Sequence, residues 1–192
     1  MALTKEDIIT LPNPHLRQRS TRVGLISPIV RQVVEDMKSA TLSWDASRQH
    51  EVGVALAAIQ IDRPYRIIVV RNDFENKDDQ TFNVFINPEI TKLEGQMIED
   101  YEGCLSVPDI YGKVKRYSKI RIKATSLEGE SFRVTAEGFL ARIFQHEIDH
   151  LNGLVFIDHI KNNPDAFYLL EADGKLKAID YDAIKDDPIL WQ

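Results

Sequence analysis

Two histidines and a glutamate late in the chain have the spacing of a metal site. Residues 146–150 read HEIDH, an HExxH pattern that on a helix places His146 and His150 one turn apart on the same face, where one cation can join them. The chain has five histidines, so such a pattern seldom arises by chance. We therefore expect a metal site. The alternative is a pair of core histidines hydrogen-bonded to carbonyls, with Glu147 as their counter-charge.

The same segment predicts a helix from about Ala136, capped by Thr135, to Asn152. On a wheel of about 100° per residue, both histidines and Glu147 fall within the apolar arc. The opposite arc is polar and is expected to face solvent; it holds Arg142, Gln145, Asp149 and Asn152. Ionisable groups on the buried arc need partners, and a cation would provide one.

A catalytic metal site also needs a third protein ligand and an open position for water. Downstream of the histidines the chain offers His159, Glu171 and several aspartates, but it lacks the extended HExxHxxGxxH pattern. The better candidate is Cys104, the single cysteine, in the segment YEGCLS at 101–106. A thiolate beside a flexible glycine is a good soft ligand. Considered alone, without the HExxH pattern, Cys104 is better explained as a small buried apolar residue.

A third segment, GVALAAIQ at 53–60, is a run of small residues that ends in an amide. Together with EGCLS at 102–106 and QHEIDH at 145–150, it resembles the peptide deformylase family, which is marked by GxGxAAxQ, EGCxS and HExxH segments in this order. LPNPHLR at 11–17 is similar to the family's N-terminal sequence, and the resemblance covers residues 8–160. One departure is Ala55, which stands at the second glycine of the first motif and adds a methyl group where substrate backbone is expected to pass.

The resemblance implies a role for each matching residue. Cys104, His146 and His150 would hold one divalent metal ion, with water in the fourth position. Fe²⁺ is the expected metal, and Zn²⁺, Ni²⁺ or Co²⁺ are able to replace it in purified protein. A bound cation lowers the pKa of water from about 16 to about 7 and so supplies hydroxide at neutral pH. Glu147 would pass the water proton to the leaving amine.

Two further groups would stabilise the developing oxyanion: the side chain of Gln60 and the backbone N–H of Leu105. The methionine side chain of the substrate is expected in an apolar pocket. The residues implied in substrate binding are Gly53, Val54, Ala55, Gly103 and Ile143.

The implied activity is that of a metal-dependent hydrolase that removes the N-formyl group from the N-terminal formylmethionine of newly made polypeptides. Its expected partners are these formylated N-termini and the ribosome. Two alternatives stay open. One is a zinc endopeptidase built on HExxH, and the other is a non-catalytic or degenerate family member that uses the same residues as a structural or redox-sensing metal site.

These residues need helices and strands to position them. Ser27-Pro28 has the form of a helix start, and apolar residues from Ile29 to Met37 recur at helical spacing, which predicts an amphipathic helix ending before Trp44. Between residues 65 and 135 the signal changes to short β-rich runs separated by turns. The expected fold class is α+β, with short antiparallel strands packed around a central HExxH helix and an N-terminal amphipathic helix.

Length and composition favour a single catalytic domain over residues 1–192, in which 161–192 is a C-terminal extension packing on the body. The formal net charge of −6 disfavours nucleic acid as the main ligand, so no direct nucleic-acid site is predicted. No apolar run approaches the roughly 20 residues of a membrane span, and the start of the chain lacks the features of a secretory signal. The expected location is therefore cytoplasmic, without membrane association.

Overall fold

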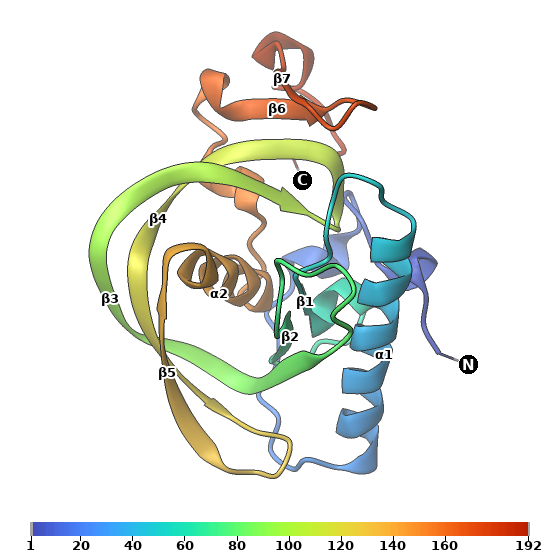
Figure 1. The fold of residues 1–192 in the computed structure, drawn as a ribbon. Coiled ribbons are helices and arrows are strands. Elements are labelled where there is room, and N and C mark those ends of the chain that lie inside the picture. Colours follow the sequence, from blue (N-terminus) through green and yellow to red (C-terminus); the bar gives the residue numbers. More distant parts are fainter. Residues whose placement is uncertain (1, 192) are drawn as a thin grey trace.

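The computed structural model describes residues 2–191, which form an α+β fold with an antiparallel sheet (Figure 1). The helices are α1 (Pro28–Ala46) and α2 (Gly138–Leu151). The strands are β1 (Ala55–Ala57), β2 (Ile67–Arg71), β3 (Phe82–Cys104), β4 (Val107–Thr125), β5 (Ser131–Glu137), β6 (Phe167–Leu170) and β7 (Leu176–Ala178). Their order in the sheet is β1-β2-β3-β4-β6-β7, and β5 also pairs with β4.

Helix α1 begins at the Ser27-Pro28 pair and packs one face into the core. Ser27 is the N-cap, and its hydroxyl oxygen accepts a hydrogen bond from the backbone N–H of Val30 at 3.4 Å. The helix continues to Ala46, so the expectation that it ends before Trp44 is wrong. Trp44 is buried because it continues the spacing of Met37 and Ala40 along the apolar face, which keeps the last turn helical.

Strands β1 and β2 are buried on both faces and lie between the two helices. Because side chains alternate along a strand, Ile67 and Val69 pack in the cluster that contains α1, whereas Ile68 and Val70 pack in the cluster that contains α2. The segment that follows β1, the 3₁₀ helix Ala58–Ile61, contacts both helices. The motif at 53–60 is thereby brought beside α2.

Strands β3 and β4 are much longer than the short strands expected from the sequence, with 23 and 19 residues. Register shifts interrupt their pairing at four places, for example between Glu94 and Met97, and such irregularities bend a ladder. The resulting hairpin curves around α2 (Figure 1). The middle of β3 is exposed, and its apolar residues, such as Met97 and Ile98, do not alternate regularly with polar ones, so no hydrophobic alternation reveals its strand character in the sequence.

Helix α2 begins at Gly138 rather than at Ala136, because β5 runs on to Glu137. Glu137 is the N-cap in place of the expected Thr135, and its side chain makes no capping hydrogen bond. The helix carries both histidines of the HExxH pattern and is almost entirely buried. No helix within residues 2–191 combines the length and apolarity that a membrane span requires.

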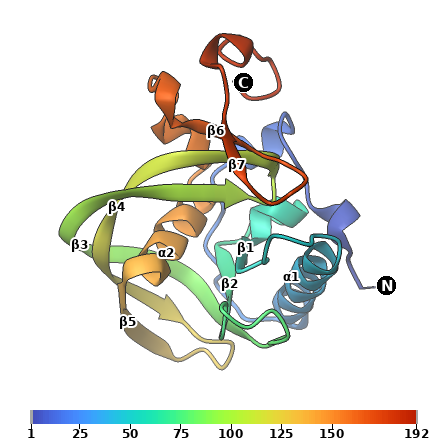
Figure 2. The ribbon, with the colours of Figure 1, turned by 45° about the horizontal axis from the view of Figure 1, so that its top comes forward.

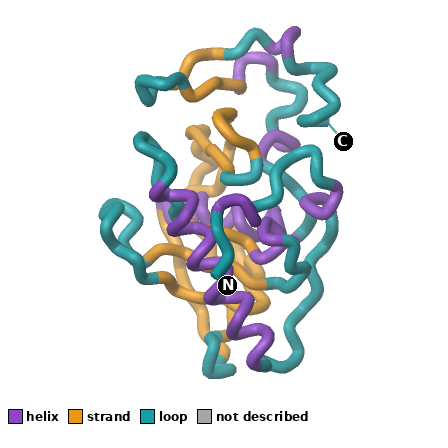
Figure 3. The backbone as a smooth tube through the Cα atoms, turned by 90° about the vertical axis from the view of Figure 1, so that its right-hand side faces the viewer, coloured by secondary structure: helices purple, strands orange, loops and turns teal. Residues whose placement is uncertain are grey.

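After α2 the chain returns to the edge of the sheet. Strand β6 pairs with β4 at Ile110–Gly112, and β7 pairs with β6. Phe167 and Leu190 are buried in a cluster with residues of the body such as Leu16 and Val114. Figures 2 and 3 show the β6–β7 hairpin lying along this edge at one end of the molecule.

The core between the sheet and α2 should carry much of the stability. Phe144 of α2 is 1% exposed and makes an edge contact with Phe85, with ring centroids 4.8 Å apart. We expect Phe144→Ala to lower the free energy of unfolding by about 3–5 kcal/mol through lost burial and a residual cavity. The measurement is urea unfolding followed by circular dichroism. Phe139→Ala on the same helix is the control, since Phe139 is 49% exposed and should change stability by less than about 1 kcal/mol. Equal effects of the two changes would contradict this account of the core.

Candidate metal centre

Three soft or borderline metal donors meet at the junction of the β3–β4 turn and helix α2. Cys104 is the last residue of β3, and His146 and His150 lie one turn apart on α2. Their donor atoms all lie within 4.8 Å of one another, and Cys104 Sγ is 3.2 Å from His150 Nε2. All three side chains are buried. The donors expected from sequence are therefore brought together.

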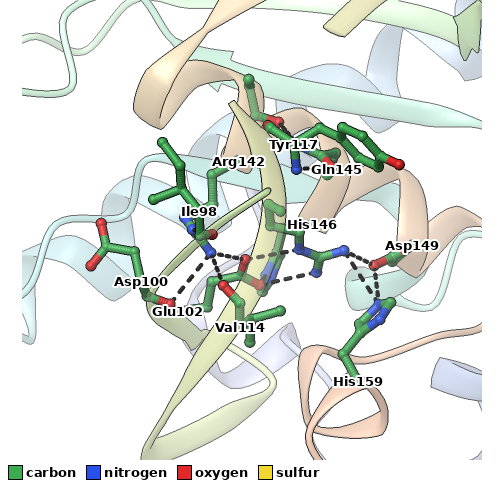
Figure 4. Close-up of polar contacts among 12 residues, drawn as sticks. Ile98, Asp100, Glu102, Val114, Tyr117, Arg142, Gln145, His146, Asp149 and His159 are labelled. Carbon is green, nitrogen blue, oxygen red and sulfur yellow. Dashed lines mark hydrogen bonds and ion pairs between the residues drawn. The ribbon is translucent and has the colours of Figure 1, made fainter. Parts of the chain in front are cut away.

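His146 is oriented by a buried carboxylate that the sequence interpretation did not single out. Nδ1 of His146 lies 3.0 Å from Oε2 of Glu102, as Figure 4 shows. Glu102 also forms ion pairs with Arg116, Nε to Oε1 at 2.9 Å, and with Arg142, Nη1 to Oε1 at 2.8 Å. A histidine held through Nδ1–H presents Nε2 as the free ligand nitrogen. The sequence did contain a signal that could have identified Glu102, because this residue is the first of the EGCLS segment.

The polar arc of α2 faces the curved hairpin and not solvent, which corrects the expectation for Arg142, Gln145 and Asp149. Arg142 donates to the carbonyls of Val114 and Ile98, both at 2.8 Å (Figure 4). Gln145 forms two hydrogen bonds with the backbone of Tyr117. Its Oε1 accepts from the Tyr117 N–H at 3.1 Å, and its Nε2 donates to the Tyr117 carbonyl at 2.9 Å. The helical wheel could not foresee this, because a wheel takes no account of the strands that pack against the arc, and the segments around Ile98 and Tyr117 show no regular alternation of apolar residues.

His159, which the sequence offered as another third ligand, belongs to this polar network and not to the donor cluster. Asp149 accepts from Arg116 at 2.6 Å and lies 2.7 Å from Nε2 of His159 (Figure 4). His159 is thus engaged by Asp149 away from the three donors. Glu171 lies in the C-terminal segment and forms an ion pair with Lys177 at 3.3 Å. Within residues 2–191, neither joins the donor cluster.

Gln60 is buried against the cluster and has a fixed orientation. Its Oε1 accepts a hydrogen bond from the backbone N–H of Ala57 at 2.9 Å. This turns the amide nitrogen toward the centre, where Nε2 lies 3.1 Å from Ser106 Oγ and 3.6 Å from Cys104 Sγ. The amide is therefore a preorganised donor beside the cysteine.

The electrostatics of the cluster favour a cation at its centre. Burial raises the pKa of the Cys104 thiol, but the charges and hydrogen bonds of His150 and His146 outweigh it and bring the pKa to about 5. Burial lowers the pKa of His146, yet Cys104 and Glu102 together raise it well above its usual value. A buried thiolate in this setting needs neighbouring positive charge, which a divalent metal supplies when the imidazoles are neutral ligands.

Glu147 stands beside the donors without a partner of its own. It is 5% exposed, and its Oε2 is buried without a hydrogen-bond partner within the described chain. Burial is the main reason that the pKa of Glu147 rises to about 7. A donor set of one thiolate and two imidazoles fits a divalent transition metal. With three protein donors and this free carboxylate oxygen, the residues present suit a metal site that keeps a position for a small ligand.

A cavity of about 220 Å³ opens onto the cluster. Most residues expected at the substrate line it: Val54, Ala55, Gln60, Gly103, Cys104, Leu105, Ile143, His146 and Glu147. His150 lies deeper, at 0% exposure. The sequence interpretation missed further lining residues: Trp44, Glu51, Val52, Tyr101, Glu102, Tyr111, Phe139 and Arg142. They come from α1, from the loop after it, from the β3–β4 hairpin and from α2, so their proximity depends on the fold.

The two glycines that were expected to bind substrate, Gly53 and Gly103, differ in their position relative to the cavity. At Gly103, which lines the cavity, an added Cβ would lie 2.7 Å from the Tyr111 ring, so the ring covers the bare backbone. Gly53 does not line the cavity. An added Cβ there would lie 2.9 Å from Thr41 Cγ2 of α1, and the Gly53 N–H donates to Asp45 at 2.9 Å. The structure places Gly53 behind the site, as a packing contact with α1.

Comparisons with known proteins agree on one family. The family profile described as polypeptide deformylase matches residues 5–165. A peptide deformylase of Rhizobium meliloti (strain 1021) is 42% identical over 158 residues, which cover 82% of this chain and 86% of that protein. One from Mesorhizobium japonicum is 43% identical over 154 residues, covering 80% and 82%.

Solved structures show the same likeness. A Legionella pneumophila peptide deformylase superimposes with a TM-score of 0.71 at 38% identity, covering 82% of this chain and 86% of that one. The Synechococcus elongatus enzyme in complex with actinonin gives a TM-score of 0.73 at 32% identity, covering 85% and 88%. A Met-Ala-Ser bound peptide deformylase of Acinetobacter baumannii gives 0.71 at 32% identity, covering 83% and 99%.

The buried Glu102 network should be essential for stability. We expect Glu102→Gln to lower the free energy of unfolding by about 3–5 kcal/mol, because it removes the anion that balances the buried Arg116 and Arg142. Glu94→Gln is the matched control: Glu94 also accepts from an arginine, Arg121 at 2.7 Å, but that arginine is 54% exposed, so the cost should stay below about 1 kcal/mol. Urea unfolding of the two variants gives the comparison, and a cost below 1 kcal/mol for Glu102→Gln would refute the role.

Proposed function

The chain belongs to the polypeptide deformylase family, whose members are metal-dependent enzymes that remove the N-formyl group from nascent polypeptides, and we propose that its catalytic centre is the cavity at Cys104, His146 and His150. The observation that carries this proposal is the meeting of three buried donors with the Glu147 carboxylate, whose Oε2 has no hydrogen-bond partner within residues 2–191, at one cavity.

Cys104, His146 and His150 would hold the ion through Sγ and ring nitrogens. When bound, a divalent metal lowers the pKa of water and polarises a carbonyl. Fe²⁺ is the proposed metal, with Zn²⁺, Ni²⁺ or Co²⁺ as replacements in purified protein. Glu102 keeps the His146 ring oriented through Nδ1 and is itself held by two guanidinium groups, so that the ligand does not need to reorganise when the site is used.

Glu147 moves the proton. Its Oε2 is free and buried, so it can accept a proton from the attacking water and deliver it to the nitrogen of the leaving amine. Burial raises the pKa of Glu147, so its carboxylate is a stronger base than an exposed one and holds the proton near neutral pH until it is delivered. Gln60 Nε2 and the backbone N–H of Leu105 stabilise negative charge on the formyl oxygen, and Gln60 is suited to this because Ala57 fixes its other end.

The peptide would lie in the cavity, with its methionine side chain against Val54 and Ile143. The Acinetobacter baumannii relative was solved bound to Met-Ala-Ser, which supports a peptide that begins with methionine as the ligand of this chain. Ala55 lines the cavity at 3% exposure, so its methyl group narrows the path of the substrate backbone by little. Gly103 lines the cavity beside the Tyr111 ring, and its backbone would lie next to the substrate main chain.

We also propose that residues 1–192 form one catalytic domain, with 161–192 as its C-terminal extension. Substrates arise at translating ribosomes, so ribosome association and a cytoplasmic location belong to the same proposal.

Formate release tests the assignment. The wild-type chain, prepared without oxygen in the Fe²⁺ form, should release formate from a formyl-methionyl peptide, and Glu147→Ala should keep the metal but lower turnover by about 10²- to 10⁴-fold. Elemental analysis measures the metal. Glu137→Ala at the exposed N-cap of the same helix is the control and should keep wild-type turnover. Near-wild-type turnover by Glu147→Ala would rule out the proton-shuttle role.

Metal retention tests the ligand set. Cys104→Ala removes one of three donors, so metal affinity should fall by at least about 10-fold, since even residues that only orient ligands cost 10- to 100-fold when changed. The readout is metal content after dialysis against a weak chelator, with thermal melting to confirm that the variant is folded. Unchanged stoichiometry in a folded Cys104→Ala protein would exclude Cys104 as a ligand.

A further inference from the structure

The C-terminal hairpin contacts the rim of the catalytic cavity, although it follows the part of the chain that the family profile matches, residues 5–165. Strand β6 adds to the edge of β4 beside Tyr111, whose register partner is Tyr168. Tyr111 lines the cavity. The sheet face that carries the cavity residue therefore continues onto the hairpin (Figure 2).

Tyr168 completes a cluster of two aromatic rings and one cation. Its ring lies 5.0 Å from that of Tyr101 in an edge contact, and Tyr101 lines the cavity and is 37% exposed. Lys113, the register partner of Tyr101, holds its Nζ 5.2 Å from the Tyr101 ring centre and 5.3 Å from that of Tyr168. Tyr168 of the extension thus helps to hold a lysine of the body beside Tyr101, a residue that lines the cavity.

The turn of the hairpin is anchored at a second point on the rim. An added Cβ at Gly174 would lie 2.8 Å from the His50 ring, so the turn packs closely on the loop after α1. Glu51 of that loop lines the cavity and accepts a hydrogen bond from the Tyr111 hydroxyl at 2.7 Å. The hairpin is therefore held in a defined position relative to the cavity.

Lys113 differs from the other charged groups of this rim because it has no carboxylate partner within residues 2–191. Arg48 is paired with Asp109 at 2.6 Å and with Glu51 at 3.5 Å. Glu171 on the hairpin is paired with Lys177. Hydrogen bonding to the phenol group of Tyr168, together with the charges of Tyr101 and Tyr168, raises the pKa of Lys113, so its ammonium group is cationic at neutral pH.

We propose that Lys113, held between Tyr101 and Tyr168, is a specificity-determining residue that binds an acidic side chain of the formylated peptide, at a position following the methionine. The inference rests on the proposed function, since it places a peptide in the cavity. An ammonium group has three donors, so the two ring faces leave at least one for a substrate carboxylate. Formyl-methionyl peptides with aspartate or glutamate after the methionine are then the preferred substrate class.

The test compares matched peptides that carry Glu, Gln or Lys at the second, third or fourth residue. The wild-type chain should show a kcat/KM for Glu about two- to five-fold above that for Gln at one of these positions, with Lys lowest. The preference should shrink at about 0.5 M salt, because an exposed pair is screened. Lys113→Met and Tyr168→Leu should bring the Glu-to-Gln ratio close to one, and Lys113→Arg should keep it above one.

Lys161→Met is the matched control, since Lys161 also lies over an aromatic ring, with Nζ 5.3 Å from the centre of Trp191, but that ring does not line the cavity. It should keep the wild-type ratio. A ratio of one at every position in the wild type, or a ratio that Lys113→Met leaves unchanged, overturns the inference. Absence of formate release from the Gln peptides would instead overturn the proposed function. The same preference can then be measured as the ratio of the Kd values of the unformylated Gln and Glu peptides.

Discussion

The buried carboxylate of Glu102 is the interaction on which the rest of the site depends. It lies between the guanidinium groups of Arg116 and Arg142 and the imidazole of His146, so one anion joins strand β3, strand β4 and helix α2. A carboxylate at 5% exposure is tolerated only because each of its oxygens has charged partners. The same contacts set the position of Cys104, two residues along the strand, relative to the histidines.

The curvature of the β3–β4 hairpin follows from the same constraint. A helix that carries metal donors on its apolar arc also has a polar arc, and in a buried helix that arc needs partners. The hairpin provides them: Arg142 and Gln145 bond to its backbone carbonyls and amides, and Asp149 bonds to Arg116. The register shifts of β3 and β4 allow the sheet to bend far enough to reach these side chains. Helix and hairpin therefore specify one another's position.

The cavity is assembled from segments that are distant in the chain, and each contributes a different kind of group. The segment at 53–60 supplies the fixed amide of Gln60, the β3–β4 turn supplies the thiol, and α2 supplies imidazoles and the acid Glu147. The rim is shared with the C-terminal hairpin through Tyr168.

The sequence by itself determined the chemistry of the centre and the types of its elements. HExxH spacing on a helix, a lone cysteine beside glycine and an amide after a run of small residues identify donors, because these relations are local and depend only on helical geometry and side-chain chemistry. Tertiary structure alone decided that Glu102 orients His146, that Gly53 packs on α1, and that Tyr168 reaches the rim. The contacts of Glu102 and Tyr168 depend on how β3, β4 and β6 pair and bend, and the contact of Gly53 depends on how the loop after α1 returns to the helix. Strand register and curvature arise from contacts across the whole sheet, and hydrophobic periodicity along the chain carries no record of them.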